Sequence, residues 1–284
     1  MLYNVNFVFL RHALSCSNIV GKKIYDKHIR NSLLIKYKDP IISDAGKQDS
    51  IKSGIELKEF IPKFDIVGSS VTLRAMETAY YTNSGLGDPF KEIYVFPYLR
   101  EIEYNTINIK DPNNNLIANK DVTLNLSHNI KSFDDQKEYL IKEGINNYIN
   151  FEYVLDDELR NQAGNIDIFI KWFSSNVLKN MIKDDGYYSD DKFNDIKSIF
   201  DIKNDSMPVI NVLIFTHAHV IAQFSNKLVN NNTGFILYTF AEKKGDDINI
   251  YHKKDIDLLE PDIKRTSIKC PMEHCNEICN HINI

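Results

Sequence analysis

Two histidines directly follow apolar runs that are typical of buried strands. His12 comes after Val5–Leu10, with Arg11 beside it, and His217 comes after Asn211–Thr216. An imidazole can act as a nucleophile, or as a proton donor and acceptor, near neutral pH. Because ligands bind at the carboxyl ends of parallel strands, we expect both rings to lie at one rim of a sheet. A single histidine at such a place is more often structural, so the pair needs support from other residues.

Arg74 lies in the first turn of a predicted helix, Thr72–Tyr81, which follows the predicted strand Phe64–Gly68 after two serines. Backbone N–H groups and the dipole at a helix N-terminus favour anions, and a guanidinium offers a bidentate fork for phosphate oxygens. The same pattern also fits a capped helix in which Arg74 pairs with Glu77.

A fourth predicted strand, Ile93–Phe96, leads to Arg100, Glu101 and Glu103. On their own these charges fit a solvated loop. Beside two histidines and two arginines, a carboxylic acid can protonate a leaving group. The four strand ends together predict a phosphoryl-transfer site, and the sequence leaves open whether Glu101 or Glu103 is the proton donor.

The elements that must position these residues alternate between strands and helices. A helical pattern at Asp44–Phe60 follows a capping signal at Ser43, and Phe235–Phe240 is a further strand with Ile248–His252 as its hairpin partner. Alternation of this kind favours an α/β fold with a mostly parallel central sheet and helices on both faces.

A stretch from about Asn105 to Asp205 differs from the rest, with Asn- and Asp-rich connections around helical patterns near Asp134–Asn150 and Asn165–Met181. We interpret it as a largely helical insertion that packs over the sheet. Residues 1–269 then form one domain, and residues 270–284 form a Cys/His-rich tail.

The motifs resemble those of the histidine phosphatase superfamily, also called phosphoglycerate-mutase-like. The family pattern Arg-His-Gly-Glu-Ser-x-x-Asn agrees with residues 11–18 at four of its six specified positions, and Ser-Ser-x-x-x-Arg-Ala-x-Glu-Thr-Ala agrees with residues 69–79 at all of them. Shorter family elements resemble residues 42–46, 99–101 and 216–218, in family order. The resemblance implies a three-layer sandwich.

The resemblance also implies roles for single residues. His12 would be the nucleophile that forms a phosphohistidine, and Glu101 would protonate the leaving alcohol and later deprotonate water. The residues expected to bind the phosphoryl group are Arg11, Asn18, Arg74 and His217, with Arg100 extending the pocket. No metal or cofactor is required by this mechanism.

Three positions depart from the family pattern. Ala13 and Ala218 replace glycines, and Leu14 replaces an acidic residue, which leaves the substrate open. The element that distinguishes mutases is broken after Glu101. We therefore expect a metal-independent phosphatase acting on a phosphorylated small molecule or phosphoprotein. The alternatives are a phosphoglycerate mutase and a pseudo-enzyme that binds a phosphorylated ligand without turnover.

Composition limits the other classes of function. The formal net charge of −5 gives no global attraction to nucleic acid or to an anionic membrane, and no run of apolar residues is long enough to span a bilayer. The first residues lack the pattern of a secretory signal, so we expect a cytoplasmic protein, with a homodimer as one oligomeric outcome. The tail contains Cys270, Cys275 and Cys279. Because their spacing matches no familiar zinc motif, we expect free thiols there and not a zinc site.

Overall fold

The computed structural model describes residues 2–23, 39–101, 106–110, 116–121, 130–182, 209–225, 232–244 and 247–258. Glu103, the alternative proton donor, and the Cys/His-rich tail lie outside the described residues. The predictions made for them therefore stay predictions.

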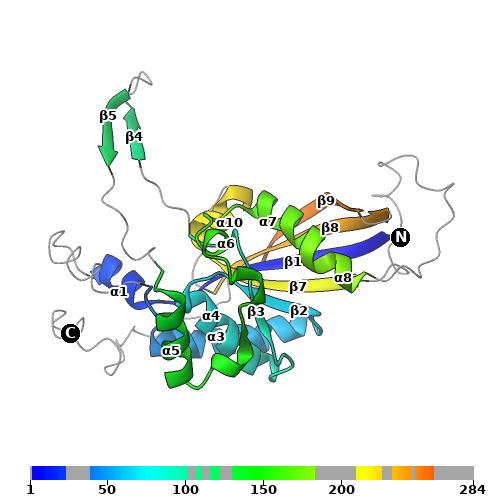
Figure 1. The fold of residues 1–284 in the computed structure, drawn as a ribbon, viewed down its shortest axis with the longest axis horizontal. Helices are drawn as coiled ribbons and strands as arrows, with labels where there is room; N and C mark the ends of the chain where they lie inside the picture. Colours follow the sequence, from blue (N-terminus) through cyan, green and yellow to red (C-terminus); the bar gives the residue numbers. More distant parts are fainter. Residues whose placement is uncertain are drawn as a thin grey trace.

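A seven-stranded sheet with the order β6-β3-β2-β7-β1-β8-β9 forms the centre of the molecule (Figure 1). The five strands from β6 to β1 are parallel to their neighbours, whereas β8 is antiparallel to β1 and β9 is antiparallel to β8. This confirms the predicted mostly parallel sheet and the hairpin at its edge. The strands are β1 (Leu2–Arg11), β2 (Ile66–Ser69), β3 (Ile93–Val95), β6 (Ile149–Asn150), β7 (Val209–Thr216), β8 (Gly234–Lys244) and β9 (Asp247–Leu258).

Helices cover both faces of the sheet, because alternate side chains of its strands are apolar on both sides. In β1, Phe7 and Phe9 belong to one buried cluster, and Val8 and Leu10 belong to the other. The first cluster is closed by α7 (Ile166–Phe173), the π-helical turn Ser174–Leu178, α8 (Lys179–Met181) and α10 (Ala218–Ser225). The second is closed by α3 (Asp44–Phe60), α4 (Leu73–Leu86) and α5 (Phe133–Lys142).

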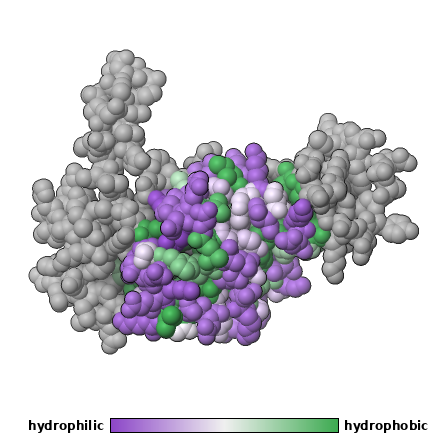
Figure 2. Space-filling view, in the orientation of Figure 1, coloured by the Kyte–Doolittle hydropathy of each residue, from purple (hydrophilic) through white to green (hydrophobic). Residues whose placement is uncertain are grey.

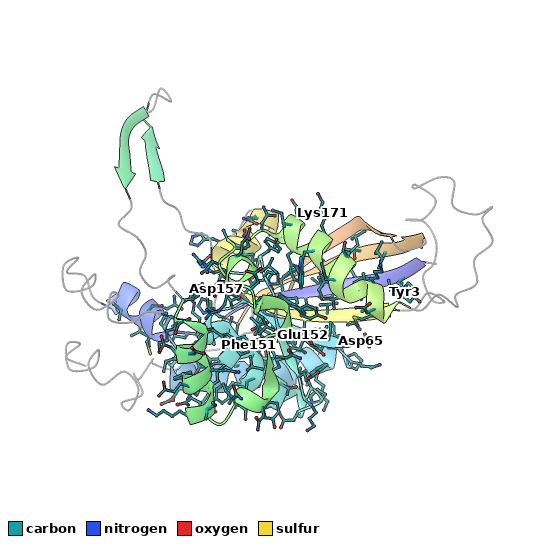
Figure 3. The ribbon with its side chains drawn as sticks, in the orientation of Figure 1. Tyr3, Asp65, Phe151, Glu152, Asp157 and Lys171 are labelled. Carbon is teal, nitrogen blue, oxygen red and sulfur yellow. The ribbon has the colours of Figure 1, made fainter. Side chains whose placement is uncertain are left out.

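The two helical layers lie on opposite sides of the sheet. Figure 3 shows Lys171 of α7 on one side, and Phe151, whose ring meets Phe133 of α5 edge to face, on the other. The predicted three-layer arrangement is confirmed. Two short helices, α1 (Cys16–Lys23) and α6 (Asp157–Arg160), complete the described α-helices.

Both helical patterns predicted for the insertion contain a helix, one over its full length and one in part. One continuous helical segment from α7 to α8 confirms the pattern at Asn165–Met181, with Phe169, Phe173 and Val177 buried. The helix predicted for Asp134–Asn150 is wrong beyond Lys142, because Gly144 adopts a φ of +72° and ends α5.

The residues that follow α5 extend the sheet. A 3-10 turn at Asn146–Tyr148 leads into the edge strand β6, which pairs in parallel with β3, and a second 3-10 turn, Glu152–Val154, follows. Earlier in the insertion, β4 (Thr106–Lys110) and β5 (Leu116–Asp121) form a separate two-stranded antiparallel sheet. The described part of the insertion therefore contains the strands β4, β5 and β6 beside the helices α5 to α8.

The surface in Figure 2 is mostly hydrophilic over the described residues, with hydrophobic side chains in small separate areas. No helix in the described ranges is both long enough and apolar enough to cross a membrane.

Candidate active site

His12 follows β1 directly, and its side chain is only 2 % exposed. The backbone N of His12 donates to the carbonyl of Thr216 over 2.9 Å, which joins the ends of β1 and β7. Its ring Nδ1 lies 2.7 Å from the carbonyl oxygen of Ala13. A carbonyl can only accept, so Nδ1 carries the proton and the lone pair of the neutral ring lies on Nε2. This is the tautomer in which Nε2 can act as a nucleophile.

The loop after His12 is held by two helices. The carbonyl oxygen of Leu14 accepts two hydrogen bonds from Ser43, one from the backbone N (2.8 Å) and one from the side-chain hydroxyl (3.0 Å). The hydroxyl of Ser43 also caps α3. The backbone N of Ala13 donates to Thr78 of α4 over 2.9 Å. A Cβ at Gly46 would lie 2.5 Å from the carbonyl oxygen of Leu14, so this close approach requires glycine. The motif at residues 42–46 thus positions the motif at residues 11–18.

His217 lies beside His12, as the sequence predicts for two strand ends at one rim. The two ring centroids are 5.1 Å apart. Nδ1 of His217 accepts from Nη2 of Arg74 over 3.3 Å, because a guanidinium can only donate. Nε2 therefore carries the proton and faces the hydroxyls of Ser70 (3.0 Å) and Thr72 (3.3 Å). His217 is thus fixed as a neutral ring whose Nδ1 side meets Arg74.

Arg74 is 2 % exposed and lies in a crowded electrostatic environment. Burial lowers the pKa of its guanidinium from the usual value, and the nearby charge of Arg11 lowers it further, whereas Glu101 and Asp39 act in the opposite direction. Two neighbouring cations of this kind favour a dianionic ligand between them. The phosphate-binding role of Arg11 and Arg74 stays a prediction, and their two charges lie close enough to interact.

Asp39 supports Arg74, and nothing in the sequence patterns pointed to it. Its Oδ1 accepts from the backbone N of Leu73 over 2.9 Å, which caps α4 in place of Thr72, whose own side chain makes no cap bond. Its Oδ2 accepts from Nε2 of Gln136 on α5. Burial raises the pKa of Asp39, against the opposing effects of these hydrogen bonds and of Arg74.

The chain of hydrogen bonds continues into the insertion. Nε2 of Gln136 also donates to the carbonyl of Val71 (2.8 Å), and Oε1 of Gln136 accepts from Nη2 of Arg160 on α6 (2.7 Å). Nη2 of Arg160 also donates to the carbonyl of Lys131 over 2.7 Å. The insertion is therefore connected to the start of the helix that carries Arg74.

Asn18 and Arg100, both predicted to bind phosphate, are held by local contacts. Oδ1 of Asn18 accepts from the backbone N of Ser15 (3.3 Å) and from its hydroxyl (3.0 Å), so its Nδ2 is the donor end of the amide. Nη1 of Arg100 donates to the carbonyl of Asn161 in the insertion over 3.3 Å. This contact turns part of the Arg100 guanidinium towards the insertion.

Glu101 is 5 % exposed, and its Oε1 lies 3.3 Å from Nδ1 of His219. The hydrogen bond and charge of Glu101 raise the pKa of His219, while burial and the charge of Arg11 lower it. Sequence reasoning assigned no role to His219. The only signal for it was its place two residues after His217, in the first turn of a helix at the same rim.

Glu77 does not pair with Arg74, contrary to the simpler interpretation of the helix. Its Oε1 accepts from the hydroxyl of Tyr139 (2.6 Å) and its Oε2 from the backbone N of Ile42 (2.8 Å), and burial raises its pKa to about 7. Cys16, at the start of α1, is disulfide-bonded.

The structure thus brings five predicted residues to one rim of the sheet: Arg11, His12, Arg74, Glu101 and His217. They supply a nucleophilic nitrogen, two cations and a carboxyl group in a largely buried setting. This set of groups can displace an alcohol from a phosphomonoester and stabilise the charge that develops on the phosphoryl oxygens.

No protein-family model and no curated protein sequence matches the chain. Among solved structures it is similar to the ecdysone phosphate phosphatase of Bombix mori in complex with tungstate, with 16% identity, a TM-score of 0.44 and coverage of 95% of this chain and 98% of that one. It is also similar to a mycobacterial glucosyl-3-phosphoglycerate phosphatase (13% identity, TM-score 0.38, 89% and 97% covered). A third is the phosphoserine phosphatase of Entamoeba histolytica (13%, 0.34, 88% and 97%). These three solved structures are members of the histidine phosphatase superfamily, the family that the sequence motifs resemble.

Proposed function

We propose that this protein is a metal-independent phosphatase that hydrolyses a phosphomonoester through a phosphohistidine formed on His12. The observation that carries the proposal is the hydrogen bond of 2.7 Å from Nδ1 of His12 to the carbonyl of Ala13. It leaves the lone pair on Nε2, at the sheet rim where the other predicted groups lie. A nucleophile of this kind divides one difficult displacement into two easier steps.

The charge on the phosphoryl group is met by Arg11 and Arg74. They supply the positive charge that a metal ion supplies in other phosphatases, and they are fixed before the substrate arrives, which is the condition under which such charges lower a barrier most. His217 contributes through its contact with Arg74, which orients the guanidinium. Asn18 presents the Nδ2 donor of its amide beside the loop that follows His12.

Glu101 is the proposed proton donor and acceptor. In the first step, Nε2 of His12 bonds to phosphorus, the bond from phosphorus to the ester oxygen breaks, and the departing alkoxide takes a proton from Glu101. In the second step, water gives its proton to Glu101 and bonds to phosphorus as the bond to His12 breaks, which releases inorganic phosphate. The substrate is a phosphorylated small molecule or a phosphoprotein.

Turnover of p-nitrophenyl phosphate in excess EDTA tests the proposal. Wild-type protein should release phosphate under these conditions, and His12→Ala should not. Ala45→Ser is the control, because it changes a partly exposed residue of α3 near the same loop without touching a proposed catalytic group. Undiminished release by His12→Ala would mean that His12 is not the nucleophile.

Two other results would point to the alternative functions. Vanadate binding without any phosphate release would contradict a phosphatase and support a protein that only binds phosphorylated ligands. Interconversion of 3- and 2-phosphoglycerate, with little net release of phosphate, would support a mutase.

A further inference from the structure

His219 lies in the first turn of α10, beside the proposed acid Glu101. Its Nδ1 lies 3.3 Å from Oε1 of Glu101, and its side chain is 36% exposed whereas that of Glu101 is 7% exposed. The pair joins the first turn of α10 to the loop after β3. His219 is therefore the member of the pair that meets solvent, and Glu101 is the buried member.

We propose that His219 holds the proton that Glu101 delivers to the leaving alcohol, and takes it back when Glu101 deprotonates water. The inference rests on the proposed phosphatase function and assigns to its acid–base step a residue that acts through Glu101. His219 is thus a positioning and proton-exchanging residue, and Glu101 remains the group that touches the substrate.

The positive charge near Glu101 explains why this carboxyl group needs a neighbour that holds a proton for it. Arg74 interacts electrostatically with Glu101. A nearby cation favours the carboxylate form, which has no proton to give. A protonated imidazole at hydrogen-bond distance stores that proton next to the carboxylate, and the proton can move along the contact as negative charge builds on the leaving oxygen.

The proton count balances over one turnover. During formation of the phosphohistidine, the proton on Nδ1 of protonated His219 moves to the Glu101 carboxylate, and the carboxyl group so formed gives its proton to the departing alkoxide, so the pair loses one proton and His219 becomes neutral. During hydrolysis, water gives one proton to the Glu101 carboxylate, which passes it to Nδ1 of His219, and the pair regains its starting state. No metal, oxidant or other reactant takes part.

In the described ranges, two charged side chains shift the pKa of His219. Glu101 raises its pKa through the hydrogen bond and through charge, and Arg11, at the end of β1, lowers it together with burial. On α7, which packs against α10, the charged side chains Asp167 and Lys171 are exposed. The raised pKa keeps the proton on His219 to higher pH, and this proton is lost as the pH rises through that value.

The dependence of kcat/KM on the leaving group separates this role from a structural one, because kcat/KM includes the steps up to release of the alcohol. The test compares wild type, His219→Gln, Glu101→Gln and both together on p-nitrophenyl phosphate and on β-glycerophosphate. The p-nitrophenolate ion can leave without taking up a proton. The alkoxide of β-glycerophosphate has to be protonated as it leaves. Ala222→Ser is the control on the same helix.

We expect His219→Gln to lose roughly 10²-fold on β-glycerophosphate and much less on p-nitrophenyl phosphate. Glu101→Gln should show the same pattern, and the double variant should be no worse than Glu101→Gln. Free imidazole should partly restore His219→Ala, because the position is open to solvent. An equal loss on both substrates, or no loss, would overturn the inference while the phosphatase itself still stands.

An NMR titration makes the inference testable without turnover. The signal of His219 is the one that disappears in His219→Gln, and its pKa should fall in Glu101→Gln. An unchanged titration would show that the two groups are not coupled. A fully active His12→Ala variant, in contrast, would remove the proposed function and leave this coupling as a separate measured fact.

Discussion

Nη2 of Arg74 and Nδ1 of His217 are joined by a hydrogen bond of 3.3 Å, although the two residues are 143 positions apart in the chain. The bond fixes the tautomer of His217, and it orients the guanidinium that we propose binds the phosphoryl group. Each residue reaches this point from a different parallel strand, since Arg74 follows β2 and His217 follows β7.

Replacing Arg74 by lysine should therefore remove two functions at once. Lysine keeps one positive charge but has no planar fork with which to hold both a phosphate oxygen and His217. We expect kcat/KM to fall about 10²- to 10³-fold, as for loss of one preorganised donor. Steady-state kinetics with p-nitrophenyl phosphate measures the effect.

Arg100→Lys is the matched comparison, because Arg100 donates to the Asn161 carbonyl, a bond that lysine can also make. It should lower kcat/KM far less than Arg74→Lys. Equal losses in the two variants would show that Arg74 has no special role in the site.

Asp39→Asn tests the connection between the insertion and Arg74. The asparagine oxygen can still accept from the backbone N of Leu73, but its amide then places two donors face to face at Gln136. A buried mismatch of this kind costs about 1–3 kcal/mol. Urea unfolding should show that loss, and kcat/KM should fall because the start of α4 moves.

Asp44→Asn is the control for this variant, since Asp44 is half-exposed in the first turn of α3. It should change stability by a few tenths of a kcal/mol at most. If Asp39→Asn were as active and as stable as Asp44→Asn, the hydrogen-bonded connection would have no functional importance.

Glu77→Gln should change how stability depends on pH. The pKa of Glu77 is about 7 in the folded protein, against 4.5 as its ordinary value, chiefly because the group is buried. The folded state then binds the proton more tightly than the unfolded state, so stability falls as pH rises between these two values. The free energy of unfolding of wild type, relative to Glu77→Gln, should drop by roughly 3 kcal/mol from about pH 4.5 to about pH 8.

The exposed carboxylate Glu59, also on the α3–α4 side, supplies the control through Glu59→Gln. The comparison of wild type with Glu59→Gln should not show the drop of roughly 3 kcal/mol that is expected for Glu77. A wild-type stability that rises relative to Glu77→Gln over the same interval would contradict the assigned effect of burial.

Gly46→Ala tests the support of the loop that follows His12. The new methyl group would lie 2.5 Å from the carbonyl oxygen of Leu14, so either α3 or the loop has to shift. We expect a loss of about 1–3 kcal/mol in stability together with a clear loss of kcat/KM.

Gly144→Ala separates these two effects. The new methyl group at position 144 would meet no atom within 4 Å, but alanine is strained by the φ of +72° at this position, which follows the end of α5. It should lower stability without lowering kcat/KM. Equal activity in the two variants would mean that the contact between Gly46 and Leu14 does not position His12.

Local sequence patterns were enough to predict most strands and helices around the central sheet and the rim at which the candidate site residues meet. The helix at Asp44–Phe60 has the predicted bounds, because its capping residue, Ser43, and the backbone N of Gly46 that Ser43 accepts from are close in sequence. His12 and His217 meet because both follow parallel strands that pair with each other. These features depend on strand order and capping, which residue patterns record.

Other features depend on contacts that no local pattern contains. Asp39 caps α4 from another segment of the chain, and Gln136 and Arg160 come from an insertion that carries no family motif. The sequence pattern predicted a helix over Asp134–Asn150, whereas α5 ends at Lys142 and the chain enters β6 at Ile149. The prediction was wrong there because short apolar runs suit an edge strand as well as a helix.

A phosphohistidine on His12 can be trapped and its phosphate located. Wild-type protein is mixed with excess phosphomonoester, quenched in alkali within one turnover, digested, and examined by mass spectrometry. We predict one acid-labile phosphate on the peptide that contains His12, and none in His12→Ala. A phosphate on a different residue, or turnover with no phosphorylated enzyme at any time, would contradict the mechanism.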